Sequence, residues 1–296
     1  MNQRTTIVSG GAGRIGRHLL DHLSVQGPVL SLDQVPTEGH PHCILDVENI
    51  DALVDSIPEG SDIVHLAALD FDTNSTDKEF LGVNITGTWN ILRAAELVRA
   101  RRVVVFSSLA ATGLHIRNGK PLAKIPVDES VSCEAKDAYG AGKLAVEAIS
   151  EAFSERGLIE VTLLRPASVL FPGSLDTFIN ETNSRPNFFD YVAIHELVRA
   201  IELALVSEQA FATPTFIVAG DTACEEPTLV WYLRAFGHLP LSVQTSAFQK
   251  FPRTSVFSNE LARQRFSWTS TTDFLEVLSK TYVTPHLSEK VATNDI

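Results

Sequence analysis

The sequence has little cysteine and no long apolar run. Its three cysteines, Cys43, Cys133 and Cys224, lie far apart among 296 residues, and none belongs to a CxxC pair. Such spacing fits free thiols in a reducing compartment better than a disulfide framework, so a cytoplasmic protein is expected. No apolar run approaches the roughly 18 residues of a membrane span, and the first residues lead directly into a strand-like segment. The sequence therefore predicts neither secretion nor a membrane span.

Positive charge is also scarce. Lys and Arg number 24 against 36 Asp and Glu, which gives a formal charge of −12. A surface of this sign repels nucleic acid and anionic membranes overall, so neither is an expected partner. The expected partner is a small-molecule substrate, and a homodimer is the candidate assembly. With 44% hydrophobic and 20% charged residues, the composition is that of a globular protein.

Strand-like and helix-like segments alternate over the first two thirds of the chain. Strands are expected at Thr5–Ser9, Val29–Leu32, Asp62–Leu66, Arg102–Ser107 and Glu160–Leu164, and helices at Glu79–Ala100 and Ala138–Phe153. This alternation predicts an α/β fold with a Rossmann-type, doubly wound parallel sheet. We expect a dinucleotide-binding domain over residues 1–167. A small, mainly substrate-binding part over 168–283 should return partly to the sheet, and 284–296 should form a flexible tail.

The region after Pro166 has a different pattern. Phe171–Asn187 has no clear periodicity, whereas Ile194–Val206 predicts a helix and Thr215–Ala219 a strand. His40 to Cys43 contain two histidines and a cysteine, but Pro41 and the absence of a fourth ligand favour a loop over a metal site. No metal is expected.

A glycine-rich segment follows the first predicted strand. Gly10, Gly13 and Gly16 satisfy a GxxGxxG spacing where a helix is expected to begin. Glycines at such a turn let the backbone approach a pyrophosphate, which the positive end of the helix stabilises. A glycine-rich turn without a ligand is the alternative.

Asp33 ends the second predicted strand. A carboxylate at this position accepts hydrogen bonds from the adenosine ribose and repels a 2′-phosphate, which favours NAD over NADP. Arg14 and Arg17 lie nearby in the sequence, and a guanidinium there would favour the additional phosphate of NADP. An exposed strand-end carboxylate with no ligand is the other interpretation of Asp33.

Tyr139 and Lys143 are four residues apart on a predicted helix. Their side chains should therefore lie on one face, where the Lys143 ammonium lowers the pKa of the Tyr139 phenol toward neutrality. Ser107 and Ser108 end a predicted buried strand, at the edge where open α/β sheets bind ligands. A serine hydroxyl there can orient a substrate oxygen, although both serines are also suited to capping the next segment.

These motifs occur in an order that resembles the extended short-chain dehydrogenase/reductases of the NAD-dependent epimerase/dehydratase type. The motifs are Gly10-x-x-Gly13-x-x-Gly16, Asp33, His65-Leu66-Ala67-Ala68, Asn84, Phe106-Ser107-Ser108 and Tyr139-x-x-x-Lys143. The resemblance runs from about residue 5 to 200 and more faintly to about 281.

The resemblance implies roles for individual positions. Ser108 would be the catalytic hydroxyl, Tyr139 the acid/base, and Lys143 a ligand of the nicotinamide ribose. It also implies a set of cofactor-binding positions, namely Gly10, Gly13, Arg14, Ile15, Gly16, Asp33, Asp46, Val47, Leu66, Ala67, Ala68, Asn84, Tyr139, Lys143, Pro166 and Val169.

Departures from the family pattern narrow the expected chemistry. Leu109 and Ala110 stand where nucleotide-sugar dehydratases carry an Asp-Glu pair, which argues against dehydration. The chain is also shorter than most nucleotide-sugar enzymes of the family. We therefore expect an NAD-dependent oxidoreductase acting on a secondary alcohol or lactol of a small sugar-like or polyol substrate. An epimerase of sugars or nucleotide sugars that retains NAD is one alternative, and a dinucleotide-sensing regulatory protein is another.

Overall fold

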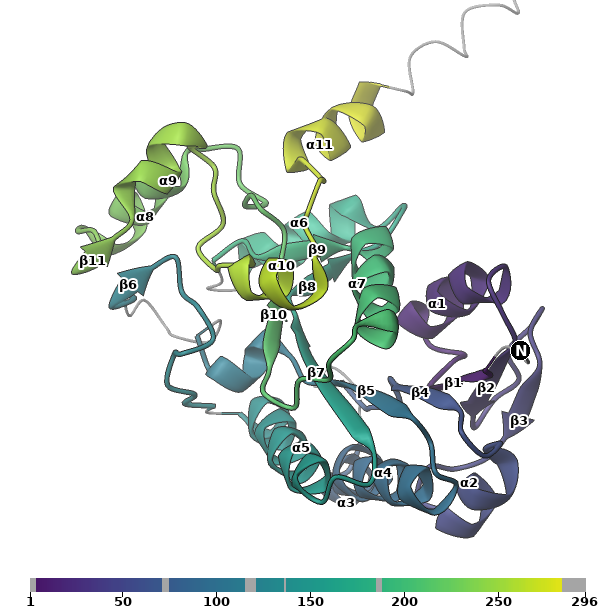
Figure 1. The fold of residues 1–296 in the computed structure, drawn as a ribbon. Helices are drawn as coiled ribbons and strands as arrows, with labels where there is room; N and C mark the ends of the chain where they lie inside the picture. Colours follow the sequence, from purple (N-terminus) through teal and green to yellow (C-terminus); the bar gives the residue numbers. More distant parts are fainter. Residues whose placement is uncertain (1–3, 71–74, 115–120, 136, 185–187, 284–296) are drawn as a thin grey trace, which may run out of the picture.

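A central sheet of seven parallel strands organises the molecule in a computed structural model of the chain (Figure 1). The structure describes residues 4–70, 75–114, 121–135, 137–184 and 188–283, so the predicted tail at 284–296 lies outside them. The strands of this sheet are β1 (Thr6–Ser9), β2 (Val29–Asp33), β3 (His42–Ile44), β4 (Asp62–His65), β5 (Arg102–Phe106), β7 (Glu160–Pro166) and β10 (Thr215–Ile217).

The strand order is β10-β7-β5-β4-β1-β2-β3, and every pair is parallel. The chain reverses its direction of winding between β1 and β4, where Ser9 pairs in register with His65. Ligands of open α/β sheets bind at the carboxyl edge beside such a reversal. The predicted Rossmann-type sheet is confirmed.

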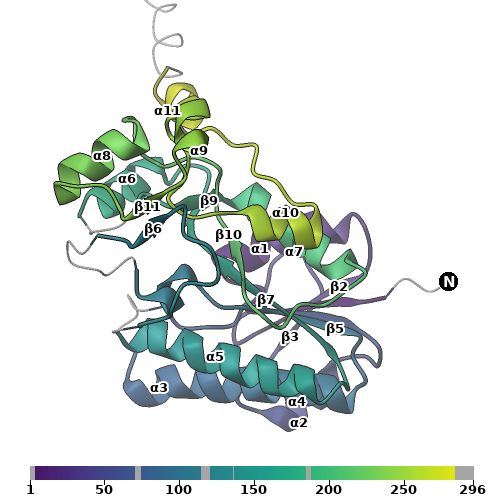
Figure 2. The ribbon, with the colours of Figure 1, turned by 60° about the vertical axis from the view of Figure 1, so that its left-hand side comes forward.

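Helices cover both faces of the sheet. They include α1 (Arg14–Ser24), α2 (Ile50–Ser56), α4 (Gly87–Leu97), α5 (Ala138–Glu155) and α7 (Ile194–Val206). Figure 2 shows α2, α4 and α5 in a layer on one side, with α1 and α7 on the other. Along β5, Val103 and Val105 belong to the core on the α4 and α5 side, and Val104 to the core beneath α7. The continuous apolar run of this strand follows from burial on both faces.

The helix predicted over Glu79–Ala100 is divided. The structure has α3 (Asp77–Leu81), a π-helix η1 (Gly82–Thr86) and then α4. A side chain at Gly82 would meet the Glu48 carboxylate at 2.5 Å, and one at Gly87 would meet Val47 at 2.6 Å. The two glycines allow this region to approach residues 47–48 closely. Two large apolar side chains of this region are not buried, since Leu81 is 55% exposed and Trp89 44%.

Two further elements differ from the prediction. His42–Ile44, expected within a loop, forms the edge strand β3 on β2. It is three residues long and partly exposed, so it has no apolar pattern to reveal it. The supposedly irregular stretch 171–187 contains α6 (Leu175–Ser184).

The remaining elements lie in the chain segments that follow β5, β7 and β10. They are η2 (Leu109–Thr112), β6 (Lys124–Ile125), β8 (Ser168–Leu170), β9 (Tyr191–Ala193), α8 (Thr228–Phe236), β11 (Ser242–Val243), α9 (Thr245–Lys250), α10 (Glu260–Phe266) and α11 (Phe274–Val283). Strand β8 pairs with β9, and β6 with β11. Phe188 packs against Trp231, Tyr232 and Phe257 and so centres an aromatic core for this part.

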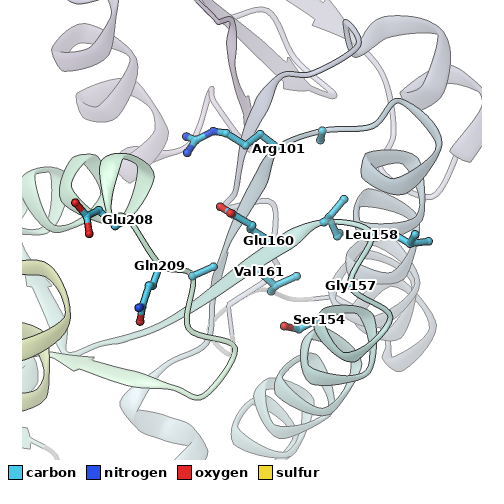
Figure 3. Close-up of a pocket in the computed structure, with 11 residues that line it drawn as sticks. Arg101, Ser154, Gly157, Leu158, Glu160, Val161, Glu208 and Gln209 are labelled. Carbon is cyan, nitrogen blue, oxygen red and sulfur yellow. The ribbon is translucent and has the colours of Figure 1, made fainter.

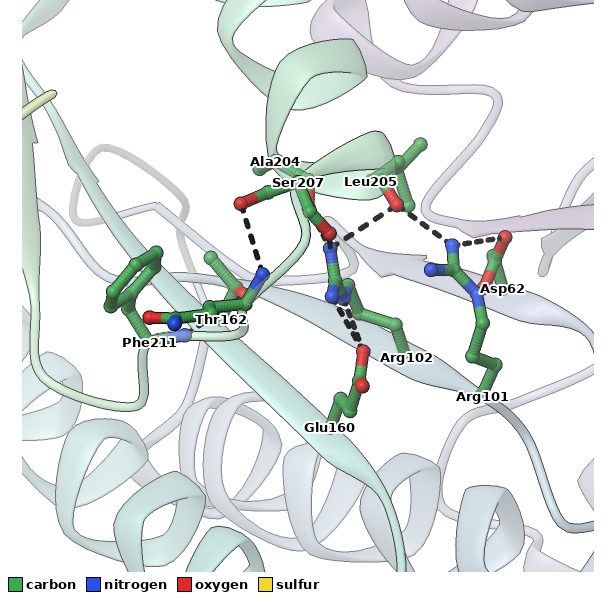
Figure 4. Close-up of polar contacts among 10 residues, drawn as sticks. Asp62, Arg101, Arg102, Glu160, Thr162, Ala204, Leu205, Ser207 and Phe211 are labelled. Carbon is green, nitrogen blue, oxygen red and sulfur yellow. Dashed lines mark hydrogen bonds and ion pairs between the residues drawn. The ribbon is translucent and has the colours of Figure 1, made fainter. Parts of the chain in front are cut away.

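Two arginines close the amino edge of the sheet (Figure 4). Arg102 is 1% exposed and donates to Glu160 and to the main-chain oxygens of Ala204 and Ser207 at the end of α7. Arg101 donates twice to Asp62, at 2.7 Å. These contacts fix α7 to β4, β5 and β7 on the side away from the candidate site.

Candidate active site

The glycine segment between β1 and α1 is shaped by close backbone contacts. Gly10 has a φ of +76°, and a Cβ there would lie 2.6 Å from the Ala67 nitrogen. A Cβ on Gly16 would lie 2.3 Å from the Gly10 oxygen. Gly13 is the N-cap of α1, and no side chain caps this helix end. The first amide groups of α1 therefore lack a capping side chain, which fits the binding of a pyrophosphate there.

Asp33 borders this segment at the end of β2. Its Oδ2 accepts a hydrogen bond from the Ala12 nitrogen at 3.0 Å. The nearby arginines have other contacts: Arg17 donates to the Ala12 oxygen, and the Arg14 guanidinium lies 3.9 Å from the centre of the Phe171 ring. The Asp33 carboxyl group is thus hydrogen-bonded to the loop that would hold the cofactor.

Asp46 and Val47 lie on the adjacent turn. Asp46 accepts hydrogen bonds from Gln34 and from the Glu48 nitrogen, both at 2.9 Å. Val47 is buried against Gly87. The structure thus places this turn beside the residue that follows Asp33, Gln34.

The segment after β4 is held by a buried amide. Asn84 of η1 accepts from the Leu69 nitrogen at 2.7 Å and donates to the Leu69 oxygen at 3.0 Å. Asn84 is 2% exposed, and both of these hydrogen bonds are with the main chain of Leu69. Asn84 therefore fixes the end of the predicted cofactor-lining run Leu66, Ala67 and Ala68, and its predicted contact with the cofactor stays a prediction.

The structure brings Ser108, Tyr139 and Lys143 together at the carboxyl end of β5. Ser108 forms a side-chain hydrogen bond with Tyr139. The Lys143 Nζ lies 5.6 Å from the centre of the Tyr139 ring and donates to the Phe106 oxygen at 3.0 Å. Ser108 also accepts from the Ala110 nitrogen, so it caps η2 as well as contacting Tyr139. The capping and the functional interpretations are compatible.

Close packing of α5 on η2 sets this geometry. A side chain at Gly140 would meet the Ala110 oxygen at 2.7 Å, so glycine at this position lets α5 approach the turn that carries Ser108. Asp137 caps α5 by accepting from the Gly140 nitrogen. The helix that carries Tyr139 thus begins at a fixed point.

The electrostatics of Tyr139 differ from the expectation. Burial raises the pKa of the Tyr139 phenol, Asp70 and Asp137 raise it further, and only the hydrogen bond from Ser108 lowers it. The lowering by Lys143 that the sequence predicts is not among these effects. Burial lowers the pKa of Lys143 to about 8, although Asp70 and Glu147 act in the opposite direction.

The two serines have different environments. Ser107 is 2% exposed and donates to the carboxylate of Glu147, which also pairs with Arg165. The sequence analysis missed Glu147 and Arg165. The available signal was the spacing of Tyr139, Lys143 and Glu147, which places all three on one face of a helix.

Pro166 and Val169 lie at and just after the carboxyl end of β7. Pro166 ends β7 opposite Ile217 of β10, and Val169 pairs with Val192 in the outer two-stranded sheet. Their predicted contacts with the cofactor stay predictions, as do the roles of the other site residues.

A hollow at the opposite edge of the sheet lies far from this chemistry. Arg101, Leu158, Glu160 and Gln209 are among the residues that line it (Figure 3). Arg101, Leu158 and Glu160 lie at the amino ends of β5 and β7, and Gln209 lies between α7 and β10, whereas Ser108 follows the carboxyl end of β5. We therefore place the candidate site at the carboxyl edge. Over the described ranges, no group of three or more His, Cys, Asp or Glu is arranged to hold a metal ion.

Comparison with known proteins gives the family. The sequence pattern of the NAD dependent epimerase/dehydratase family matches residues 6–185. The chain belongs to this family, and the predicted resemblance is confirmed. The dependence on NAD that was predicted from the residues is confirmed at the level of the family.

Curated relatives differ in their reactions. The chain is 24% identical to sterol demethylase protein B of Methylococcus capsulatus over 79% of its length and 75% of that protein. It is 31% identical to L-arabinose 1-dehydrogenase (NAD(P)(+)) of Haloferax volcanii over 53% of its length and 64% of the relative. It is 34% identical to UDP-glucose 4-epimerase of Halalkalibacterium halodurans over 48% and 43%, respectively.

Solved structures share the fold over almost the whole chain. A short-chain dehydrogenase/reductase superfamily protein from Agrobacterium tumefaciens with bound NAD has a TM-score of 0.71 at 21% identity, covering 94% of this chain and 95% of its own. MoeE5 in complex with UDP-glucose and NAD has a TM-score of 0.70 at 23% identity, covering 93% and 96%. In the part of the chain that the structure describes, no helix has the length and apolarity of a membrane span.

Proposed function

We propose that the protein is an NAD-dependent oxidoreductase that interconverts an alcohol and a carbonyl, or oxidises a lactol, on a small sugar-like or polyol substrate. The observation that carries the proposal is the meeting of Ser108, Tyr139 and Lys143 at the carboxyl edge of the sheet, the edge at which β1 leads into the uncapped start of α1. This arrangement supports a bound dinucleotide and a substrate oxygen at one edge of the sheet.

The residues around the cofactor position divide the binding between them. Gly10, Gly13 and Gly16 would receive the pyrophosphate, Asp33 the adenosine ribose and Lys143 the nicotinamide ribose. When bound, NAD supplies the acceptor and donor of hydride.

The three catalytic side chains act on the substrate oxygen. Ser108 donates a hydrogen bond that orients this oxygen and stabilises the charge that develops on it. Tyr139 takes the hydroxyl proton when the alcohol is oxidised and returns a proton when the carbonyl is reduced. Lys143 favours the phenolate by its positive charge, against burial and Asp70, which raise the pKa of the phenol. The proton therefore moves between one substrate oxygen and one phenol oxygen.

The similarity to L-arabinose 1-dehydrogenase supports a small sugar, and Leu109 and Ala110 lack the acidic pair of the dehydratases. The test is a screen of free sugars, polyols and uronates with NAD, followed by NADH absorbance, with the Tyr139→Phe protein as control. NADH formation that requires Tyr139 supports the proposal. An active wild type whose rate is unaffected by the substitution would contradict it.

The similarity to UDP-glucose 4-epimerase favours a second candidate, an epimerase that retains NAD. Native mass spectrometry of the purified protein distinguishes the two, because an epimerase should carry NAD without net NADH formation. A dinucleotide-sensing regulatory protein has no need of an intact Tyr139 and Lys143 pair, so the pair favours an enzyme.

A further inference from the structure

Glu147 lies one helical turn beyond Lys143 on α5. Tyr139, Lys143 and Glu147 are spaced by four residues, so the carboxylate continues the helix face that carries the proposed catalytic pair. Its side chain is 11% exposed. A charge so removed from water requires compensating partners.

Two other parts of the chain supply contacts to this carboxylate. Arg165 of β7 donates from Nε to Oε1 and from Nη2 to Oε2, both at 2.6 Å. Ser107, directly after β5, donates to Oε1. Arg165 is 5% exposed and also donates to the Cys133 sulfur at 3.2 Å, in the segment that leads to α5. Glu147 thus joins α5 to the ends of β5 and β7.

Side chains of α5 hold the two residues that precede the proposed catalytic serine, Ser108. Lys143 donates to the oxygen of Phe106, and Glu147 accepts from Ser107. Two consecutive residues before Ser108 are therefore attached to α5 through side chains one turn apart. The position of the Ser108 hydroxyl relative to Tyr139 depends on both attachments.

The charge of Glu147 also acts on Lys143. Groups that face the Lys143 ammonium are Asp70 from the segment after β4, His65 from β4, and Tyr139 and Glu147 from α5. Burial lowers the pKa of Lys143, whereas Asp70 and Glu147 raise it. His65 is kept neutral by burial, which lowers its own pKa to about 3. Asp70 is exposed, so Glu147 is the buried counter-charge.

We propose that Glu147 is a positioning residue for the reaction. Through Ser107 it holds the Ser108 hydroxyl at the distance from Tyr139 that the reaction needs, and its negative charge balances the Lys143 ammonium. The inference rests on the proposed oxidoreductase function. A purely structural ion pair with Arg165 would stabilise the fold, but its loss from a protein that still folds would leave kcat unchanged. The charge balance is tested by the titration of Lys143.

The first experiment measures that titration without catalysis. Protein with isotopically labelled lysine is titrated by NMR, and the Lys143 signal is assigned by its loss in Lys143→Ala. Glu147→Gln should lower the midpoint of Lys143 by about one pH unit or more. The matched control is Glu151→Gln, which removes an exposed charge one turn further along α5 and should leave the midpoint in place.

The second experiment measures rates with the substrate found in the screen. Glu147→Gln should lower kcat by at least about tenfold, keep KM for NAD within about twofold, and move the alkaline limb of the kcat profile to lower pH. Ser107→Ala should lower kcat several-fold without moving the Lys143 midpoint, which separates the positional effect from the charge effect.

Loss of Glu147 alone leaves Arg165 buried without its partner, which can prevent folding. In that case Glu147→Gln combined with Arg165→Gln removes both charges, and a smaller downward shift of the Lys143 midpoint is expected, because loss of the Arg165 charge partly offsets loss of the Glu147 charge. An unchanged midpoint, or a folded Glu147→Gln protein with wild-type kcat and pH profile, would overturn the inference. If no substrate is found for the wild type, the proposed function fails, but the NMR titration still tests the link between Glu147 and Lys143.

Discussion

His65 lies in a chain of buried hydrogen bonds that determines which of its ring nitrogens carries the proton. The Thr88 hydroxyl donates its proton to the main-chain oxygen of Asn84. It must therefore accept in its contact with the His65 Nε2, at 3.0 Å, so Nε2 carries the proton. The unprotonated Nδ1 then accepts from the Ser9 hydroxyl at 2.7 Å. The pKa of His65 is lowered to about 3, first by burial and then by Lys143. His65 therefore links β1, β4 and α4 as a neutral residue and is no acid or base in the reaction.

Tyr139→Phe should lower kcat by about 10²–10⁴-fold, because in the proposed reaction the phenol proton is transferred to and from the substrate oxygen. Affinity for NAD should stay within about twofold, since the ring remains in place. Steady-state rates and NAD titration followed by calorimetry provide the measurements. As a comparison, Lys143→Ala should lower both kcat and NAD affinity. Near wild-type turnover by Tyr139→Phe would refute the assigned role.

Asp33→Asn should narrow the preference for NAD over NADP by about tenfold or more in kcat/KM. The substitution removes the charge that repels a 2′-phosphate, yet it keeps an oxygen that can accept from the Ala12 nitrogen. Asp33→Ala should narrow the ratio too, with a larger loss of affinity for both cofactors because this hydrogen bond is lost. A wild-type protein that prefers NADP would contradict the role given to Asp33.

Among the elements, those with a regular apolar period could be predicted from the sequence. The predicted helix at Ile194–Val206 has the observed bounds, and β1, β2, β4 and β5 differ by one residue. The glycine loop could be placed because its spacing and its strand-to-helix position are local properties. The edge strand β3 and the π-helix η1 could not, since the first is too short for a pattern and the second depends on packing against Glu48.

The same distinction applies to the site. Tyr139 and Lys143 are four residues apart on one helix, so their proximity could be predicted. Glu147 and Arg165 lie on different elements, and only the packing of α5 on β7 brings them together. Their ion pair has no signature in a single sequence.

Gly16→Ala should reduce NAD affinity at least tenfold and lower the free energy of unfolding. The new Cβ would lie 2.3 Å from the Gly10 oxygen, so α1 must move away from the loop. Gly220→Ala is the control, because no heavy atom lies within 4 Å of a Cβ at that position. Denaturant unfolding and NAD titration provide the two readouts. Wild-type affinity in Gly16→Ala would show that the loop tolerates this movement.

At the scale of the whole molecule, stability depends on buried carboxyl groups as well as on the apolar core. Asp190 is 5% exposed, and burial raises its pKa from 3.8 to about 6. The folded state therefore binds this proton more tightly than the unfolded state does. The stabilising contribution is complete below about pH 4 and is lost as the pH rises through 6.

Asp190→Asn should gain stability relative to the wild type as the pH rises. Since the amide stays neutral, the difference in unfolding free energy should grow between pH 4 and 6 and reach up to about 3 kcal/mol above pH 7. Urea unfolding at several pH values gives this difference. The matched control is Asp55→Asn, which removes an exposed carboxyl group from α2. A difference between Asp190→Asn and wild type that is constant with pH would contradict the assignment.

The path of the chain after Pro166 determines where segments of related proteins could replace segments of this one in a chimera. The chain leaves the sheet through β8, α6 and β9, returns along α7 onto α1, and then adds β10 beside β7. A chimera joined after Pro166 would therefore import a foreign edge strand and a foreign cover for α1. Exchanging only the segment between β8 and β9 would keep both contacts native, so a chimera confined to that segment should retain the edge strand and the cover of α1.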